Sequence, residues 1–157
     1  MLRKNFYLMA LLVFLSACGG DNEEDKDMQK PIINSDNIEA CPGDCEQFIR
    51  GDVIHFTYVF HDNKELGKYN IEIHNNFNHH THSTSAVECD MDEEKQPVKP
   101  WVYNQDFDIP SGQKTFISQI DIPIPNDIDK GDYHFMIRLT DKAGWQEIKS
   151  VSIKIVD

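Results

Sequence analysis

Basic residues are scarce in this chain. Lys and Arg together number 15 against 27 Asp and Glu, so the formal net charge is −12 at pH 7 with histidine neutral. Such a surface repels phosphate backbones and anionic lipid headgroups, so we expect no nucleic-acid partner. Cations are the natural counterpart of a chain with this charge balance.

Long apolar runs and the motifs of familiar enzymes are also missing. The most apolar segment, residues 8–15, is too short to span a bilayer as a helix, and no segment has a convincing amphipathic helical pattern. No His-Glu-x-x-His zincin motif, Gly-x-Ser-x-Gly elbow or phosphate-binding glycine loop occurs. We therefore expect no enzyme of these classes, although a metal-dependent redox or hydrolytic role stays open.

The N-terminus has the features of an export signal. Arg3 and Lys4 give a basic start before the apolar segment, as in secretory signal peptides. Leu15-Ser16-Ala17-Cys18 then resembles the lipobox of bacterial lipoproteins, whose cysteine is acylated and becomes the first residue after cleavage. The resemblance implies that residues 1–17 are removed and that a lipid on Cys18 anchors the chain to a membrane. The alternative is an ordinary cleaved signal with an incidental cysteine.

Residues 18–30 should form an acidic tether. No apolar side chain occurs between Gly19 and Asp27, so this stretch has nothing to bury. Acidic residues directly behind a lipidated cysteine resemble the export tag of some surface lipoproteins. This implies a lipoprotein on the outer membrane of a Gram-negative bacterium, whereas the alternative is a linker without a routing role. The remaining residues, 31–157, suit a single domain.

Three cysteines remain beyond the lipidation site: Cys41, Cys45 and Cys89. Disulfides persist in exported proteins. Pairing Cys89 with Cys41 or Cys45 would close a long loop and stabilise the fold by about 4 kcal/mol, and we favour such a pair. A tight Cys41–Cys45 bridge and a metal-bound Cys89 thiolate are the alternatives.

Apolar side chains in the domain alternate with a period of two, which predicts an all-β fold. The expected strands are residues 54–60, 69–73, 116–122, 133–139 and 151–155. Asp129-Lys130-Gly131-Asp132-Tyr133 resembles the tyrosine corner of immunoglobulin-like sandwiches, in which a Tyr opens strand F. The resemblance implies an immunoglobulin-like β-sandwich with residues 69–73 as strand C. The antibody cysteine position holds Phe135, and a simple hairpin turn is the alternative.

Histidine is the most concentrated chemical feature. Four of the seven histidines fall within residues 74–82, and imidazole is a common metal ligand that also titrates near neutral pH. Strands C and F are antiparallel neighbours in the expected fold, so His74 and His134 should be cross-strand partners on the outer face.

The segment after strand C would complete the site. In an extended backbone His80 and His82 point to the same side, whereas His79 points away unless the backbone bends. We therefore predict a zinc or copper site with His80 and His82 as ligands, His74 or His134 as the third, and a carboxylate or water completing the shell. The predicted metal-binding group is His74, His79, His80, His82 and His134.

Residues 75–100 predict a long His-rich and acidic insertion after the third strand, and loops of this length usually carry a function. A merely solvated loop is one alternative. A proton switch, in which clustered imidazoles repel one another when charged, is another.

Residues 71–85, which include His-His-Thr-His at 79–82, and residues 131–145 together resemble a family of bacterial lipoproteins carrying a domain of unknown function. The likeness covers nearly all of the chain beyond the signal. It implies a lipid-anchored immunoglobulin-like domain and supplies no activity. We therefore expect a transition-metal-binding envelope protein used in uptake or sequestration, with an outer-membrane transporter or surface protein as partner. The alternative is a metal-free adhesion or protein-interaction module.

Overall fold

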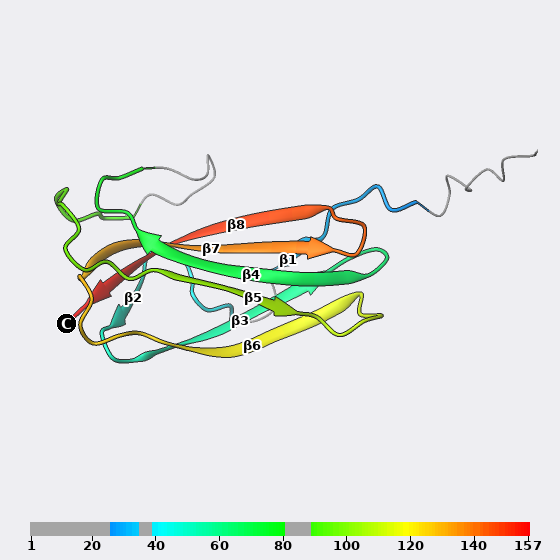
Figure 1. Ribbon diagram of the computed structural model, residues 1–157, viewed down its shortest axis with the longest axis horizontal. Helices are drawn as coiled ribbons and strands as arrows, with labels where there is room; N and C mark the ends of the chain where they lie inside the picture. Colours follow the sequence, from blue (N-terminus) through cyan, green and yellow to red (C-terminus); the bar gives the residue numbers. More distant parts are fainter. Residues whose placement is uncertain (1–25, 35–38, 81–88) are drawn as a thin grey trace, which may run out of the picture.

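The computed structural model describes residues 26–34, 39–80 and 89–157. In these ranges the chain forms eight β-strands and no helix, arranged as two sheets that pack face to face (Figure 1). The predicted all-β fold is therefore confirmed. The strands are β1 (Ile32–Asn34), β2 (Glu46–Ile49), β3 (Val53–His61), β4 (Leu66–Asn75), β5 (Tyr103–Asp108), β6 (Thr115–Pro123), β7 (Gly131–Asp141) and β8 (Gln146–Val156).

The two sheets differ in size. One has three antiparallel strands in the order β1-β3-β6, and the other has five strands in the order β2-β8-β7-β4-β5. Within the larger sheet β2 runs parallel to β8, while the other pairs are antiparallel. In Figure 1 the larger sheet lies above β3 and β6, and β4 and β7 run side by side along its middle.

The alternating apolar residues of both sheets meet in one core. Tyr69, Ile71 and Ile73 of β4 are buried, as the period of two predicts, because successive side chains point to opposite faces. Phe56 of β3 stacks against Phe135 of β7 with ring centroids 5.7 Å apart, so aromatic contacts join the sheets. The outward face of β4 and β7 is thereby available for polar side chains.

Three strands were not expected from the alternation: β1, β2 and β5. All three are short and lie at sheet edges, where a strand has a neighbour on one side only and its side chains are less buried. β5 reads Tyr-Asn-Gln-Asp-Phe-Asp, so only Tyr103 and Phe107 carry an apolar signal. Because β4 continues to Asn75 and β5 begins at Tyr103, the connection between them comprises residues 76–102.

Tyr133 ties this connection to the start of β7. Its hydroxyl donates to the Asp129 carbonyl at 2.6 Å and accepts from the Trp101 N–H at 3.1 Å. Trp101 is 4% exposed and packs edge-on against Tyr133, so it belongs to the core. No helix capable of crossing a membrane is found among the ranges given above.

Candidate metal centre

The outer face of the larger sheet carries two histidines side by side. His74 near the end of β4 and His134 near the start of β7 are partners in the antiparallel ladder, with ring centroids 5.5 Å apart. This is the cross-strand pairing that the sequence predicts. His134 is nevertheless only 5% exposed, although it lies on the outer face of the sheet. The reason is that the connection after β4 folds over this end of the sheet.

A third imidazole comes from that connection. The His80 ring lies with its centroid 5.5 Å from that of His74 and 5.1 Å from that of His134. Its backbone carbonyl also lies 2.9 Å from His134 Nε2, which joins the connection directly to β7. Three imidazoles from three separate segments thus converge at one end of the sheet.

Each of these rings has one nitrogen next to an oxygen. His80 Nδ1 lies 2.6 Å from Asn78 Oδ1, His134 Nε2 contacts the His80 carbonyl, and His74 Nδ1 lies 3.2 Å from Glu72 Oε1. A neutral imidazole that donates through one nitrogen carries its lone pair on the other. For His80 and His134 we infer these tautomers from the acceptors, which put the basic lone pair on Nε2 of His80 and on Nδ1 of His134.

The cluster is open to solvent on one side. His74 and His80 line a hollow of about 380 Å³, together with Lys95, Gln96 and Pro97 of the connection. The Lys95 ammonium lies over the Phe77 ring at 4.4 Å and donates to the Lys130 carbonyl, so it holds this wall in place. A small ligand or ion can therefore reach the imidazoles from outside.

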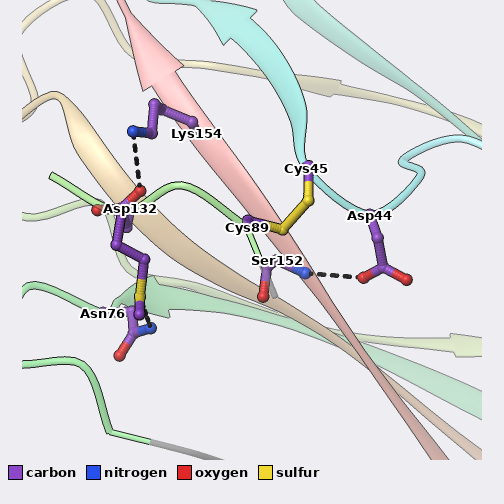
Figure 2. Close-up of a disulfide and its surroundings, with 8 residues drawn as sticks. Asp44, Cys45, Asn76, Cys89, Asp132, Ser152 and Lys154 are labelled. Atoms are coloured by element: carbon purple, nitrogen blue, oxygen red, sulfur yellow. Dashed lines mark hydrogen bonds and ion pairs between the residues drawn. A yellow bond between two sulfur atoms is a disulfide. The ribbon is translucent and has the colours of Figure 1, made fainter. Parts of the chain in front are cut away.

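Ion pairs and backbone bonds fasten the connection to β7 and β8. The Asn76 N–H donates to the Asp132 carbonyl and the Asp92 N–H to Asp132 Oδ2, each at 2.8 Å. The Lys154 ammonium lies 2.8 Å from Asp92 Oδ1. It also lies 3.4 Å from Asp132 Oδ1, and Figure 2 shows this second contact. The hydrogen bond from Lys154 lowers the pKa of Asp92 and correspondingly raises the pKa of Lys154.

A disulfide fixes the far side of the same connection. Cys45 and Cys89 are bonded, with Cα atoms 5.4 Å apart, and Figure 2 shows the bridge beside Ser152 of β8. Of the two partners that the sequence left open for Cys89, the structure has Cys45. The alternative of a Cys89 thiolate ligand was wrong, because this sulfur is bonded to another sulfur.

Of the three cysteines in the described ranges, Cys41 is the one outside the disulfide, and it should react slowly. Burial of the thiol, followed by the negative charge of Glu46, raises the pKa of Cys41 from 9.0 to about 11. At about pH 8 the reactive thiolate should therefore be about 100-fold scarcer than in an unfolded chain. We expect iodoacetamide to modify Cys41 correspondingly more slowly in the folded protein than in urea, as followed by mass spectrometry. Equal rates in both states would contradict this.

Three other histidines of the described ranges, His55, His61 and His79, have partners outside the cluster. His79 has a φ of 53°, so the backbone does bend there, and its Nε2 lies 2.9 Å from the Asp92 carbonyl. His55 contacts Asp121 and His61 contacts Thr115 on the smaller sheet. Two predicted site residues, His82 and Cys18, lie outside the described residues, as do residues 1–25 as a whole.

The match to known families covers almost the entire chain. Residues 16–156 match the family model described as Domain of unknown function (DUF4625). The chain belongs to this family. No curated protein gives a significant match. The expected domain of unknown function is thus confirmed, and because the family description carries no activity, function has to be argued from the site.

A second group of potential ligands was missed by sequence reasoning. Asp27, Asp62 and Asp141 offer ligand atoms that all lie within 4.8 Å of one another. These residues are at the opposite end of β7 from His134, and they belong to three segments that are distant in the sequence. No local spacing pattern links them, so only the tertiary structure could reveal the group.

Proposed function

We propose that this protein binds a transition-metal ion, Zn²⁺ or Cu²⁺, through His74, His80 and His134. The observation that carries the proposal is the convergence of three imidazoles from β4, β7 and the connection between β4 and β5. A carboxylate, a water or His82, which follows His80 by two residues, would complete a four-coordinate shell.

The spacing of the rings supports this proposal. Since a Zn–N bond is about 2.0–2.1 Å long, imidazole centroids around a tetrahedral ion should be about 5.2 Å apart. The three separations in the cluster are 5.1, 5.5 and 5.5 Å. The centroids are therefore spaced as a shared ion requires, but the rings would have to turn before one nitrogen from each could reach the same ion.

The partners of the rings support it as well. Metal-bound histidines commonly donate their other N–H to a carboxylate, carbonyl or similar oxygen, which orients the ring and raises its basicity. Asn78 and the His80 carbonyl stand in these positions for His80 and His134, and the Glu72 carboxylate lies 3.2 Å from Nδ1 of His74. With Cys89 in a disulfide, the donors are imidazoles, which suit Zn²⁺ and Cu²⁺ better than the thiolate-preferring Cu⁺.

We further propose a lipid-anchored envelope protein that sequesters the ion or delivers it to an outer-membrane transporter. The lipobox-like residues 15–18 and the acidic stretch behind them support the anchor. The chain enters the sandwich beside the turn after β7, whereas the histidines lie at the other end of that strand. His134 and Asp141 are seven residues apart, or about 23 Å, so the anchor and the metal would be well separated.

We also propose that the sandwich is immunoglobulin-like. The hydrogen bond from the Tyr133 hydroxyl to the carbonyl of Asp129, four residues upstream, is the bond that defines a tyrosine corner. The antiparallel pairing of β4 with β7 agrees with strands C and F of that fold.

Calorimetric titration of the full-length chain in detergent with zinc chloride and with copper chloride tests the metal proposal. We expect one ion per chain. His80→Ala should weaken binding by at least about 100-fold, because loss of an outer-shell partner alone costs about 10–100-fold. Glu72→Gln, which keeps the shape of the side chain that contacts His74, should cost about tenfold.

His55→Ala and His61→Ala are matched controls, since both histidines lie on the other sheet. Their affinity should equal that of the unaltered protein. Equal weak binding by the unaltered protein and His80→Ala would overturn the metal site. A metal-free adhesion or interaction module would then be the working function.

A further inference from the structure

A cluster of carboxylates lies at the end of the sandwich away from the histidines. Asp141 is the last residue of β7, Asp62 directly follows β3, and Asp27 precedes β1. One ligand oxygen from each lies within 4.8 Å of the others. Three separate segments thus bring three negative charges together at the entry point of the N-terminal chain.

Two oxygens in this cluster are buried without a protein partner. Asp141 is 4% exposed, and its Oδ1 accepts from the Trp145 N–H at 2.8 Å. Asp62 Oδ1 accepts from the N–H groups of Lys64 and Glu65 at 2.8 and 2.6 Å. Within the described chain, neither Asp141 Oδ2 nor Asp62 Oδ2 has a hydrogen-bond partner, although both are buried. A buried carboxylate oxygen without a partner is costly, and a cation would satisfy it.

The charges around the cluster favour a cation. Burial raises the pKa of Asp141, and the nearby charges of Asp62 and Asp27 raise it further. The ionised carboxylate of Asp141 is therefore disfavoured unless a positive charge lies beside it. Two lysines at this end bind elsewhere, since Lys30 pairs with Glu147 and Lys114 donates to the Asn63 carbonyl. Neither provides a counter-ion to the three aspartates.

We propose that Asp27, Asp62 and Asp141 bind a calcium ion. Carboxylate oxygens are the ligands of hard cations, and Ca–O distances of about 2.3–2.6 Å allow ligand oxygens up to about 5 Å apart in one shell. The separation of the carboxylate oxygens fits that span. Mg²⁺ needs shorter bonds of about 2.0–2.1 Å in near-ideal octahedral geometry, which this group suits less well.

Calcium would clamp the N-terminal segment to the sandwich. Asp27 is joined to the turn after β7 by a 3.0 Å hydrogen bond from Trp145 Nε1 to its carbonyl. A bound ion would add Asp62 and Asp141 to this attachment and order the chain just before β1. The inference is independent of the proposed histidine site, because the two sites use different residues and different classes of ion.

Thermal unfolding of the full-length chain with EGTA or with calcium chloride tests the clamp. Calcium should raise the Tm of the unaltered protein, with a Kd of about 10⁻⁴–10⁻³ M, as in extracellular calcium modules. Asp141→Asn should raise the Tm in EGTA, because the neutral amide removes a repelling charge, and should abolish the calcium-dependent rise. Asp121→Asn is the control, since Asp121 is an exposed aspartate on β6 and should leave the calcium effect unchanged.

Terbium luminescence provides a second readout that locates the ion. Trp145 contacts both Asp27 and Asp141, so Tb³⁺ bound in place of calcium should be excited through its indole. Trp145→Phe should abolish this emission. The other tryptophan, Trp101, is buried against Tyr133 at the opposite end of β7 and should not support it.

Three results would overturn the calcium site. The first is a Tm of the unaltered protein that does not change with calcium. The second is a calcium-dependent rise in the Tm of Asp141→Asn, and the third is terbium emission from Trp145→Phe that equals that of the unaltered protein. Should Asp141→Asn fail to fold, Asp62→Asn and Asp27→Asn decide the question. Both keep the oxygen that accepts backbone N–H groups, and each should lower calcium affinity at least tenfold.

Discussion

Removing the Cys45–Cys89 disulfide should lower the free energy of unfolding by about 4 kcal/mol. The bridge joins residues 44 apart, and closing a loop of this length removes about that much entropy from the unfolded chain. Urea unfolding of Cys89→Ala beside the unaltered protein measures the difference. The slope with urea should also rise, because the unfolded chain without the cross-link exposes more surface.

Cys41→Ala is the matched control for this experiment, because Cys41 is a free thiol. Its loss should cost less than about 1 kcal/mol, the scale of a small side chain in a half-buried position. A Cys89→Ala variant as stable as Cys41→Ala would show that the bridge does not constrain the protein.

Cys89→Ala should also weaken zinc binding without altering a ligand, since the connection that holds His80 would lose one of its attachments.

Replacing Tyr133 by Phe should destabilise the protein by about 3 kcal/mol. The hydroxyl that is lost bonds both the Asp129 carbonyl and the Trp101 N–H, and each buried group left without a partner costs about 1–3 kcal/mol. Urea unfolding again gives the measurement. Tyr103→Phe is the control, because the Tyr103 hydroxyl bonds only the side chain of Gln105 at the surface. Equal small losses in both variants would contradict a structural role for the corner.

Alkaline pH offers an independent check on the same residue. Burial raises the pKa of Tyr133 from 10.0 to about 12, and it also raises the pKa of Tyr58. A group whose pKa is higher in the folded state contributes stability that is present below its unfolded pKa. This contribution is lost as the pH rises through the folded pKa. Stability should therefore fall between about pH 10 and 12, and it should fall less steeply in Tyr133→Phe.

The central strands could be predicted because their signal is local. Apolar side chains recur at every second position over most of β3, β4, β6, β7 and β8, and that alternation follows directly from the strand geometry. The edge strands escaped prediction because β1 and β2 are too short to show an alternation and β5 is mostly polar. The parallel pairing of β2 with β8 also depends on a neighbour more than a hundred residues away.

Two of the three histidines in the cluster follow from strand pairing. Once residues 69–73 and 133–139 are placed as antiparallel neighbours, the register brings His74 opposite His134. The crowding of histidines in residues 74–82 indicated that His80 could bind a metal, but it did not indicate where His80 lies. Its position depends on the bend at His79 and on the attachments of the connection to Asp132 and Lys154.

Composition and alternation were sufficient for the charge balance and the all-β class, because these are properties of neighbouring residues or of strand periodicity. The facing of His74 and His134 also needed the resemblance to a tyrosine corner, which places their strands side by side. The choice of Cys45 as the partner of Cys89, the burial of His134 and the meeting of Asp27, Asp62 and Asp141 were decided only in the folded chain. Each of these depends on how segments far apart in sequence pack together, and local patterns carry no information on that packing.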